Sequence, residues 1–255
     1  MSAQNDDAVL TEKRGRLLII TLNRPDAKNA INGALSLGLA NAVRTLDSDE
    51  SLTAAVLTGA GDTFCAGMDL KSFARGEDIS HVDDFFRNGC KKPIIAAIEG
   101  YALAGGCELA LSCDLLVAAE NSKIGLREVK VGLFAAGGGL IRLGARVGFT
   151  KAMEMALTGD AISAREALEA GLLSNISEPG KAVDDAISLA ERIVENAPLA
   201  VAASKALVRA ASKGYNEKEV WEMQIPYQEQ VFTSNDAKEG PAAFAEKRQP
   251  NWTGT

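Results

Sequence analysis

Short apolar runs alternate with segments of helical periodicity along the first two thirds of the chain. Each run is brief and closed by Gly, Pro or Asn, a pattern typical of strands buried inside a sheet. The runs are Leu17–Leu22, residues 54–58, Ile94–Ile98 and Leu115–Ala119. Between the first two, residues 33–46 carry apolar side chains at helical spacing and end at a polar run. Strand–helix–strand repetition predicts an α/β fold with a largely parallel sheet.

The pattern changes in two places. Residues 71–92 are more polar and predict a mobile loop-helix flap. After residues 196–198 the strand signals stop, and three helices are predicted. They are an Ala-rich one over 199–212, one over 216–232 in which Pro226 favours a bend, and a short one over 242–247 opened by Gly240-Pro241. We therefore expect an α/β core over residues 1–195 and a C-terminal helical region over residues 196–255.

Composition and charge narrow the class of protein. With 255 residues, 47% hydrophobic and 24% charged, the chain is long enough to bury a large core without disulfide or metal staples. Its formal net charge is −7 and no basic cluster is long enough to follow a phosphate backbone, so we expect no nucleic acid partner. No apolar run reaches the roughly 20 residues of a membrane-spanning helix, and we expect no membrane partner. The polar, acidic residues 1–7 resemble no targeting signal, so a cytoplasmic enzyme is expected.

The chain has a single histidine, His81, and this excludes several kinds of active site. Metal sites built from several histidines are impossible, and we expect no metal. A Ser–His–Asp triad could use only His81, and no GxSxG motif accompanies it. No GxGxxG or GxxxxGK[ST] motif is present, so dinucleotide and phosphate-loop sites are not indicated. Proton transfer would fall to carboxylates, and charge stabilisation to backbone amides. The four cysteines form no CxxC pair and are expected to be small apolar residues.

Glu108 is the only charged residue in the segment from Tyr101 to Ser112. A strand is predicted to end at Gly100, followed by a small-residue turn and a helix that begins near Gly105. Unpaired amides at a helix start can hold an oxygen that carries negative charge. A buried carboxylate there would have a raised pKa, as a general acid or base needs. The alternative is an acid in the first helical turn that points to solvent.

Two further segments stand out. Residues 64–71 combine apolar residues with a Gly, which suggests backbone close to a ligand, or else a plain turn in which Asp69 caps a helix. Glu128 lies among charged neighbours, so a salt bridge with Arg127 or Lys130 is the simple interpretation. The glycine run after it, residues 137–139, could allow close packing at the start of the next helix. Asp114 is expected to have a structural role.

Taken together, five segments resemble the enoyl-CoA hydratase/isomerase family, the crotonase superfamily. They are residues 23–30, 64–70, 101–114, 125–139 and 239–248, in order and at the family's spacing. The resemblance covers nearly the whole chain. It implies a spiral of repeated ββα turns with a C-terminal helical region used in trimer formation, giving a homotrimer or a hexamer built from two trimers.

The resemblance also implies a site. The family stabilises a thioester enolate with two backbone amides, which by motif would belong to Ala66 and Gly105. Hydratases of the family keep two Glu residues, here Glu108 and Glu128. Positions matching its coenzyme A contacts are Lys28, Phe64, Ala66, Met68, Asp69, Leu70, Phe244 and Lys247, the last two across a subunit boundary. The implied substrate is an acyl-CoA thioester, with coenzyme A part of the substrate and no separate cofactor.

The implied activity is reversible hydration of a trans-2-enoyl-CoA, with one water held between the two Glu residues. An enoyl-CoA isomerase, which needs one carboxylate, and a carnitinyl-CoA-type dehydratase remain as alternatives, with a non-catalytic RNA-binding relative or a degenerate structural member more distant. Three departures from the hydratase pattern lie near the substrate pocket: Arg127 for a Pro, Ala135-Ala136 for Pro-Gly, and Ala104 for a Gly. They leave the acyl chain undetermined.

Overall fold

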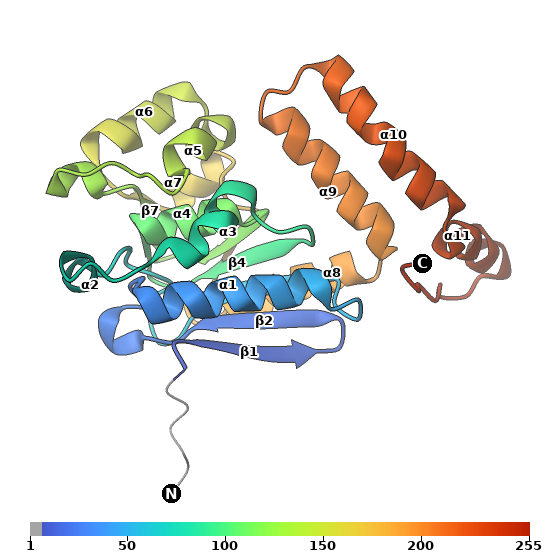
Figure 1. Ribbon diagram of the computed structural model, residues 1–255, viewed down its shortest axis with the longest axis horizontal. Helices are drawn as coiled ribbons and strands as arrows, with labels where there is room; N and C mark the ends of the chain where they lie inside the picture. Colours follow the sequence, from blue (N-terminus) through green and yellow to red (C-terminus); the bar gives the residue numbers. More distant parts are fainter. Residues whose placement is uncertain (1–6) are drawn as a thin grey trace, which may run out of the picture.

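A computed structural model describes residues 7–255 of the chain (Figure 1). The expectation that the chain has no targeting signal rests on residues 1–7. Residues 1–6 lie outside the described residues.

A six-stranded sheet forms the centre of the molecule. Its order is β1 (Val9–Arg14), β2 (Leu17–Leu22), β3 (Ala54–Gly59), β4 (Ile94–Ile98), β6 (Leu115–Ala119) and β9 (Asn175–Ser177). β1 pairs antiparallel with β2, and every other pairing in this sheet is parallel. The prediction of an α/β fold with a largely parallel sheet is confirmed. All four predicted strands are present, β3 ending one residue later, whereas β1 and β9 were not predicted.

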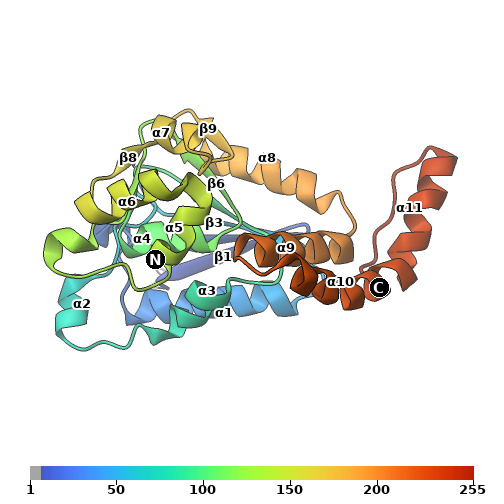
Figure 2. The ribbon, with the colours of Figure 1, turned by 90° about the horizontal axis from the view of Figure 1, so that it is seen from above.

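Helices cover both faces of this sheet. Helix α1 (Gly33–Ser48) lies on one face and α8 (Ala182–Val194) on the other (Figure 2). Along β2, alternate side chains enter two separate apolar clusters: Leu18 and Ile20 pack with α1, whereas Leu17 and Ile19 pack with α8. Because neither face meets water, the central strands are apolar at nearly every position.

A second, three-stranded sheet of β5 (Tyr101–Leu103), β7 (Lys123–Gly125) and β8 (Ile162–Ser163) lies beside the first. The chain passes from β4 in the large sheet to β5 in the small one and then into helix α4 (Gly105–Ser112). It repeats this path through β6, β7 and helix α5 (Gly139–Val147). This is the ββα repetition implied by the family resemblance. The turn predicted between Gly100 and Gly105 is mostly the short strand β5.

The remaining core elements surround the ends of these strands. The polar segment 71–92 contains α2 (Leu70–Ala74), the 3-10 turn Ser80–Val82 and α3 (Asp83–Asn88), as the loop-helix prediction requires; its mobility stays a prediction. Two more 3-10 turns span Pro25–Ala27 and Glu128–Val131. Helices α6 (Phe149–Thr158) and α7 (Ala164–Glu169) follow α5 and were not predicted.

Three helices extend beyond the core: α9 (Pro198–Ser212), α10 (Glu217–Thr233) and α11 (Asn235–Glu246) (Figure 1). The first two match the predicted helices, and α10 continues through Pro226. The prediction for the last helix is wrong at its start. Ser234 caps α11 by accepting a hydrogen bond from the Ala237 amide at 3.0 Å, so the helix begins well before Pro241, which lies inside it. The domain boundary between residues 195 and 196 stays a prediction.

Among residues 7–255, no helix combines the length and apolarity needed to cross a bilayer.

Candidate active site

A cavity of about 2090 Å³ opens between the ends of the core strands, helices α3 and α5, and helix α9. Ala66, Met68, Gly105, Glu108 and Glu128 all line it. The structure therefore gathers the two predicted carboxylates and both predicted backbone segments around one space. A cavity of this kind is the usual place for a small-molecule site.

The segment between β3 and α2 is fixed by main-chain hydrogen bonds on both sides. On one side, the Leu103 amide of β5 donates to the Cys65 carbonyl at 3.0 Å. On the other side, the Ile31 amide donates to the Gly67 carbonyl at 2.8 Å, and the Asp69 amide donates to the Ile31 carbonyl at 2.9 Å. The segment thus makes single β-bridges to β5 on one side and to Ile31 on the other, and these bridges fix the direction of its amides.

A neighbouring pair of amides is free to hold a ligand oxygen, and it differs from the predicted pair. The Ala66 amide donates to the Lys28 carbonyl at 3.0 Å, so the prediction of Ala66 as a free donor is wrong. Among residues 7–255, the amides of Met68 and Gly105 have no acceptor. They lie close together, since a Cβ atom on Gly105 would be 3.6 Å from the Met68 nitrogen. Gly105 is confirmed as the first residue of α4, where amides are unpaired.

This close approach depends on glycine. Gly67 has a φ of +111°, and a Cβ atom there would lie 2.9 Å from the Ala104 Cβ. A Cβ atom on Gly106 would lie 2.1 Å from the Cys65 carbonyl oxygen. Ala104, which precedes the helix, has a φ of 50° and a ψ of −127°, a conformation that costs a non-glycine residue about 1–3 kcal/mol. The strained backbone of Ala104 therefore lies where the segment before α2 meets the start of α4.

Glu108 lies in the first turn of α4 and is only 5% exposed, so the alternative in which it points to solvent is wrong. Its Oε1 atom accepts a hydrogen bond from the Gly139 amide at 2.9 Å. Burial raises the pKa of Glu108 to about 7; the Gly139 hydrogen bond opposes this shift and the nearby Glu128 charge adds to it. A carboxyl group with such a pKa can both accept and release a proton near neutral pH.

The glycine run before α5 packs around the Glu108 carboxylate. A Cβ atom on Gly137 would lie 2.9 Å from its Oε2 atom, and one on Gly139 would lie 3.1 Å from its Oε1 atom. Close packing at the start of the next helix was expected from the sequence and is confirmed. The structure adds that the packing partner is the carboxylate itself.

Glu128 begins the 3-10 turn that follows β7. Both of its carboxylate oxygens are buried and have no hydrogen-bond partner within the part of the chain that the structure describes. The simple salt-bridge interpretation is wrong, because Lys130 pairs instead with Asp160 at 2.5 Å and Arg127 makes no ion pair among residues 7–255. Burial raises the pKa of Glu128. Two carboxyl groups that make no salt bridge among residues 7–255 therefore face one cavity.

Residues 12–255 match the enoyl-CoA hydratase/isomerase family. The chain belongs to this family. It is 41% identical to the enoyl-CoA hydratase EchA19 of Mycobacterium tuberculosis over 95% of each chain, and 40% identical to a carnitinyl-CoA dehydratase of Proteus mirabilis over 94% of this chain and 96% of that protein. The crystal structure of an enoyl-CoA hydratase from Mycobacterium tuberculosis H37Rv superimposes with a TM-score of 0.95 at 54% identity, covering 98% of this chain and all of that one. The crotonase fold implied by the resemblance is thereby confirmed.

The coenzyme A positions carried over from the enoyl-CoA hydratase/isomerase family divide into those at the cavity and those away from it. Ala66, Met68 and Leu70 line the cavity. Lys28 lies beside it, because its carbonyl accepts from the Ala66 amide, and its ammonium pairs with Asp62 at 2.9 Å. Their contact with coenzyme A stays a prediction.

Phe64 and Asp69, two other family positions, do not line the cavity. The Phe64 side chain is fully buried in the apolar core. Asp69 caps α2 by accepting from the Lys71 and Ser72 amides, and it pairs with Arg24 at 3.1 Å, so the simple capping interpretation is confirmed.

The C-terminal positions lie far from this site. Phe244 is 86% exposed on α11, and Lys247 ends that helix. Both views place α11 at the opposite end of the molecule from α2 (Figures 1 and 2). These residues could reach coenzyme A only on another subunit, which stays a prediction.

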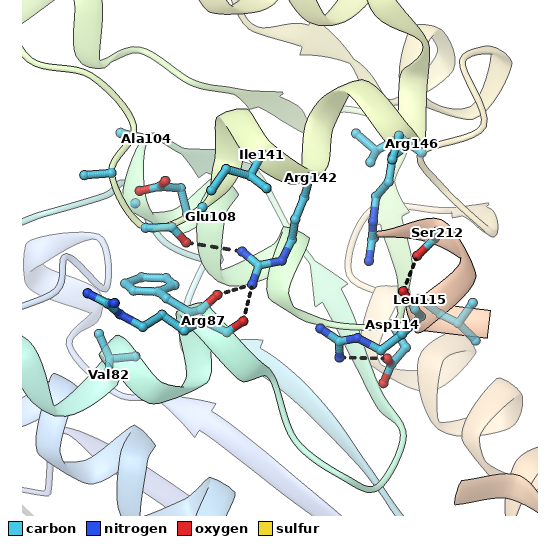
Figure 3. Close-up of a pocket in the computed structure, with 18 of the residues that line it drawn as sticks. Val82, Arg87, Ala104, Glu108, Asp114, Leu115, Ile141, Arg142, Arg146 and Ser212 are labelled. Atoms are coloured by element: carbon cyan, nitrogen blue, oxygen red, sulfur yellow. Dashed lines mark hydrogen bonds and ion pairs between the residues drawn. The ribbon is translucent and has the colours of Figure 1, made fainter. Parts of the chain in front are cut away.

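Asp114 has the structural role that was expected. It pairs with Lys205 at 2.7 Å and with Arg209 at 3.3 Å, joining the start of β6 to α9 (Figure 3). Sequence reasoning missed Arg142, which points into the cavity beside Glu108 and donates to main-chain carbonyls of Phe86 and Gly137 (Figure 3). In the sequence, only the position of Arg142 one turn after the glycine run could have indicated that it lies at the site.

The described residues contain no group of three or more His, Cys, Asp or Glu side chains suited to a metal ion. The four cysteines are free and buried, as small apolar residues are.

Proposed function

We propose that the protein is an enoyl-CoA hydratase that adds water reversibly to a trans-2-enoyl-CoA and forms a 3-hydroxyacyl-CoA. One observation carries this proposal: Glu108 and Glu128, both with raised pKa values, face the cavity onto which the free amides of Met68 and Gly105 open. The reaction needs both elements, since negative charge develops on the thioester oxygen while one proton leaves water and another reaches carbon.

The amides of Met68 and Gly105 hold the thioester oxygen. In the enolate formed by attack on the β-carbon, this oxygen carries the charge. Donors that are fixed in place before the reaction contribute about 3–4 kcal/mol each. The hydrogen bonds that hold the turn before α2 and the glycine contacts that bring it against α4 support this role for Met68 in place of Ala66.

Glu108 deprotonates the attacking water, and Glu128 delivers a proton to the α-carbon. The Gly139 amide fixes the orientation of the Glu108 carboxylate, whereas the Glu128 carboxylate has both oxygens available for water. A charge on Glu128 raises the pKa of Glu108, so the protonation of one group affects the other.

Coenzyme A enters as part of the substrate, and no separate cofactor takes part in this scheme. The backbone around Ala66, Met68 and Leu70 receives the adenine end, and Lys28 approaches the phosphates. Phe64 and Asp69 act indirectly, by fixing that backbone. The same proposal includes a homotrimer or hexamer in which Phe244 and Lys247 reach a neighbour's coenzyme A, a cytoplasmic location, and a place in fatty acid β-oxidation; these rest on the family resemblance.

The runner-up is a dehydratase that acts on a carnitinyl-type acyl group. It is favoured by the 40% identity to a carnitinyl-CoA dehydratase over 94% of this chain. An isomerase is less well supported, because it would leave one of the two carboxylates without a function.

Product analysis with crotonyl-CoA and with a 3-enoyl-CoA tests the proposal. We expect loss of enoyl absorbance and formation of the 3-hydroxyacyl product from crotonyl-CoA. Glu108→Gln should lower the hydration rate about 1000-fold while coenzyme A thioester binding persists. Glu120→Gln, an exposed carboxylate after β6, is the matched control and should be unchanged. Hydration by Glu108→Gln at the parent rate would refute the assigned role.

A further inference from the structure

Beyond Glu108, the cavity wall carries a cluster of positively charged side chains. Arg142 and Arg146 project from α5, and Arg209 and Lys213 come from α9 and its end; all four line the cavity. In Figure 3 Arg142 lies next to Glu108, and Arg146 lies farther from Glu108, on the side of Ser212 and Leu115. We call these four residues the cationic cluster.

The two arginines of α5 have no carboxylate partner in the described part of the chain. Arg142 donates to the main-chain carbonyls of Phe86 and Gly137, the latter at 3.3 Å. Arg146 donates to the Cys113 carbonyl at 2.5 Å. Carbonyl oxygens satisfy single N–H groups but do not neutralise a guanidinium, which presents five donors.

The nearest structural carboxylate is already committed. Asp114 accepts from Lys205 at 2.7 Å, from Arg209 at 3.3 Å and from the Ile94 amide at 2.9 Å. It pairs directly with Lys205 and Arg209 and makes no ion pair with the arginines of α5, although its charge favours the charged form of Arg146. The excess of positive charge also runs against the net charge of the chain, which is −7.

Keeping these like charges together costs free energy. Burial lowers the pKa of Arg142, and the nearby Arg209 and Arg146 lower it further. Burial likewise lowers the pKa of Arg146. A bound anion would relieve this repulsion, and arginine can hold a carboxylate with two parallel hydrogen bonds.

We propose that the cationic cluster binds a carboxylate at the far end of the acyl group, so that the preferred substrates are enoyl-CoA thioesters whose chain ends in an anionic group. The inference rests on the proposed function for the orientation of the thioester. With the thioester oxygen at Met68 and Gly105 and the reacting carbons at Glu108, an acyl chain that continues along the cavity passes Arg142 and reaches Arg146. Apolar side chains of Leu115 and Val208 border the same region and would contact the methylene groups.

Binding of matched saturated thioesters tests the proposal without requiring turnover. We would compare adipyl-CoA with hexanoyl-CoA and suberyl-CoA with octanoyl-CoA by isothermal titration calorimetry. The wild-type protein should bind the carboxylate-ended member of at least one pair about 10-fold or more tightly than its methyl-ended counterpart. Arg146→Gln should remove most of this preference and leave the affinity for the methyl-ended thioester within about threefold.

Two other variants make the result interpretable. Arg165→Gln removes the same charge from an exposed position on α7 and should leave the preference unchanged. Lys213→Gln removes an exposed member of the cluster, and should reduce the preference partly even if Arg146→Gln folds poorly. Enoyl thioesters of the same lengths should show the same order in kcat/KM.

Three outcomes would overturn the proposal: equal affinity within every pair, equal weakening of both members by Arg146→Gln, or a changed oligomeric state of that variant with an unchanged preference. A changed oligomeric state with an unchanged preference would mean that the cationic cluster contacts a second copy of the chain. A carboxylate preference in binding without any hydration of enoyl thioesters would refute the proposed function and leave the anion site standing.

Discussion

The catalytic core and the helical extension bury their apolar side chains to very different degrees. Strand β3 of the core buries five of its six residues, whereas helix α10 of the extension buries none. Leu57 is fully buried in β3, whereas Trp221 and Ile225 on α10 are 59% and 63% exposed. Every group proposed for proton transfer or oxygen binding belongs to the core. The extension contributes cationic side chains at its contact with Asp114 and an apolar surface that fits the proposed oligomer.

This difference explains where the chemistry lies. A carboxylate acquires a raised pKa only where water is excluded, and free amides hold their direction only where the surrounding backbone is fixed. The core supplies both conditions around Glu108. Four substitutions would test how far the two regions differ.

Leu57→Ala should have the largest effect. Truncation of a fully buried leucine leaves a cavity in the cluster between the sheet and α1, and we expect a loss of about 4 kcal/mol in the free energy of unfolding. Urea denaturation measures it. A loss below about 1 kcal/mol would mean that neighbouring side chains fill the cavity, and that the core is less rigidly packed than the full burial of Leu57 indicates.

Asp114→Asn tests the contact between the two regions. The change leaves Lys205, with a side chain only 8% exposed, without its partner, and we expect about 3 kcal/mol of destabilisation. Asp62→Asn is the matched control, because the Asp62 side chain is 79% exposed and its pair with Lys28 contributes little. Equal effects of the two substitutions would show that α9 is held to the core by other contacts.

Glu108→Gln should change how stability depends on pH. The folded pKa of about 7 lies above the ordinary value of 4.5, so from pH 4.5 to 7 the unfolded chain releases a proton that the folded chain keeps. Wild-type stability attributable to this group is complete below about pH 4.5 and is lost as pH rises through 7. The variant cannot lose a proton, so it should be more stable than wild type by about 3 kcal/mol at pH 8 and nearly equal to it at pH 4.

The comparison is made by denaturant titration at several pH values, with Glu120→Gln as the control. A parallel pH dependence of wild type and Glu108→Gln would contradict the assignment of a buried, protonated carboxyl.

Ile225→Ala should have the smallest effect. The side chain is 63% exposed, so its truncation should change the unfolding free energy of the monomer by less than about 0.5 kcal/mol. The same substitution should shift the subunit equilibrium measured by analytical ultracentrifugation if α10 lies in the proposed oligomer. A large loss of monomer stability would mean that the Ile225 side chain contributes to folding as a core residue does.

Strands that are buried on both faces were predictable, whereas short or exposed ones were not. The central strands are continuous apolar runs because α1 and α8 cover them, and the sequence shows such runs directly. β1 was missed because it is an edge strand whose last four residues are exposed, and β5 and β7 because three residues carry no periodicity. For α11, Pro241 was read as a first-turn residue, but the capping side chain is Ser234.

The site was predictable in its carboxylates but not in one of its amides. Glu108 stood out as a lone charge among apolar residues, and burial indeed follows. The choice between Ala66 and Met68 depends on which amides the neighbouring segments use, and those partners, Lys28 and Ile31, are distant in sequence. The lack of a partner for Glu128 could not be foreseen either, because Lys130 turns to Asp160.

The donors at Met68 and Gly105 belong to the main chain, and this has a consequence for how the protein can change. Exchanging the Met68 side chain for any residue except proline leaves its N–H in place, so the grip on a thioester oxygen is insensitive to most single mutations. The carboxylates offer no such protection, since one exchange at position 108 or 128 removes a proton carrier. A descendant of this protein could therefore abandon hydration for another reaction of the same enolate while keeping the means to form it.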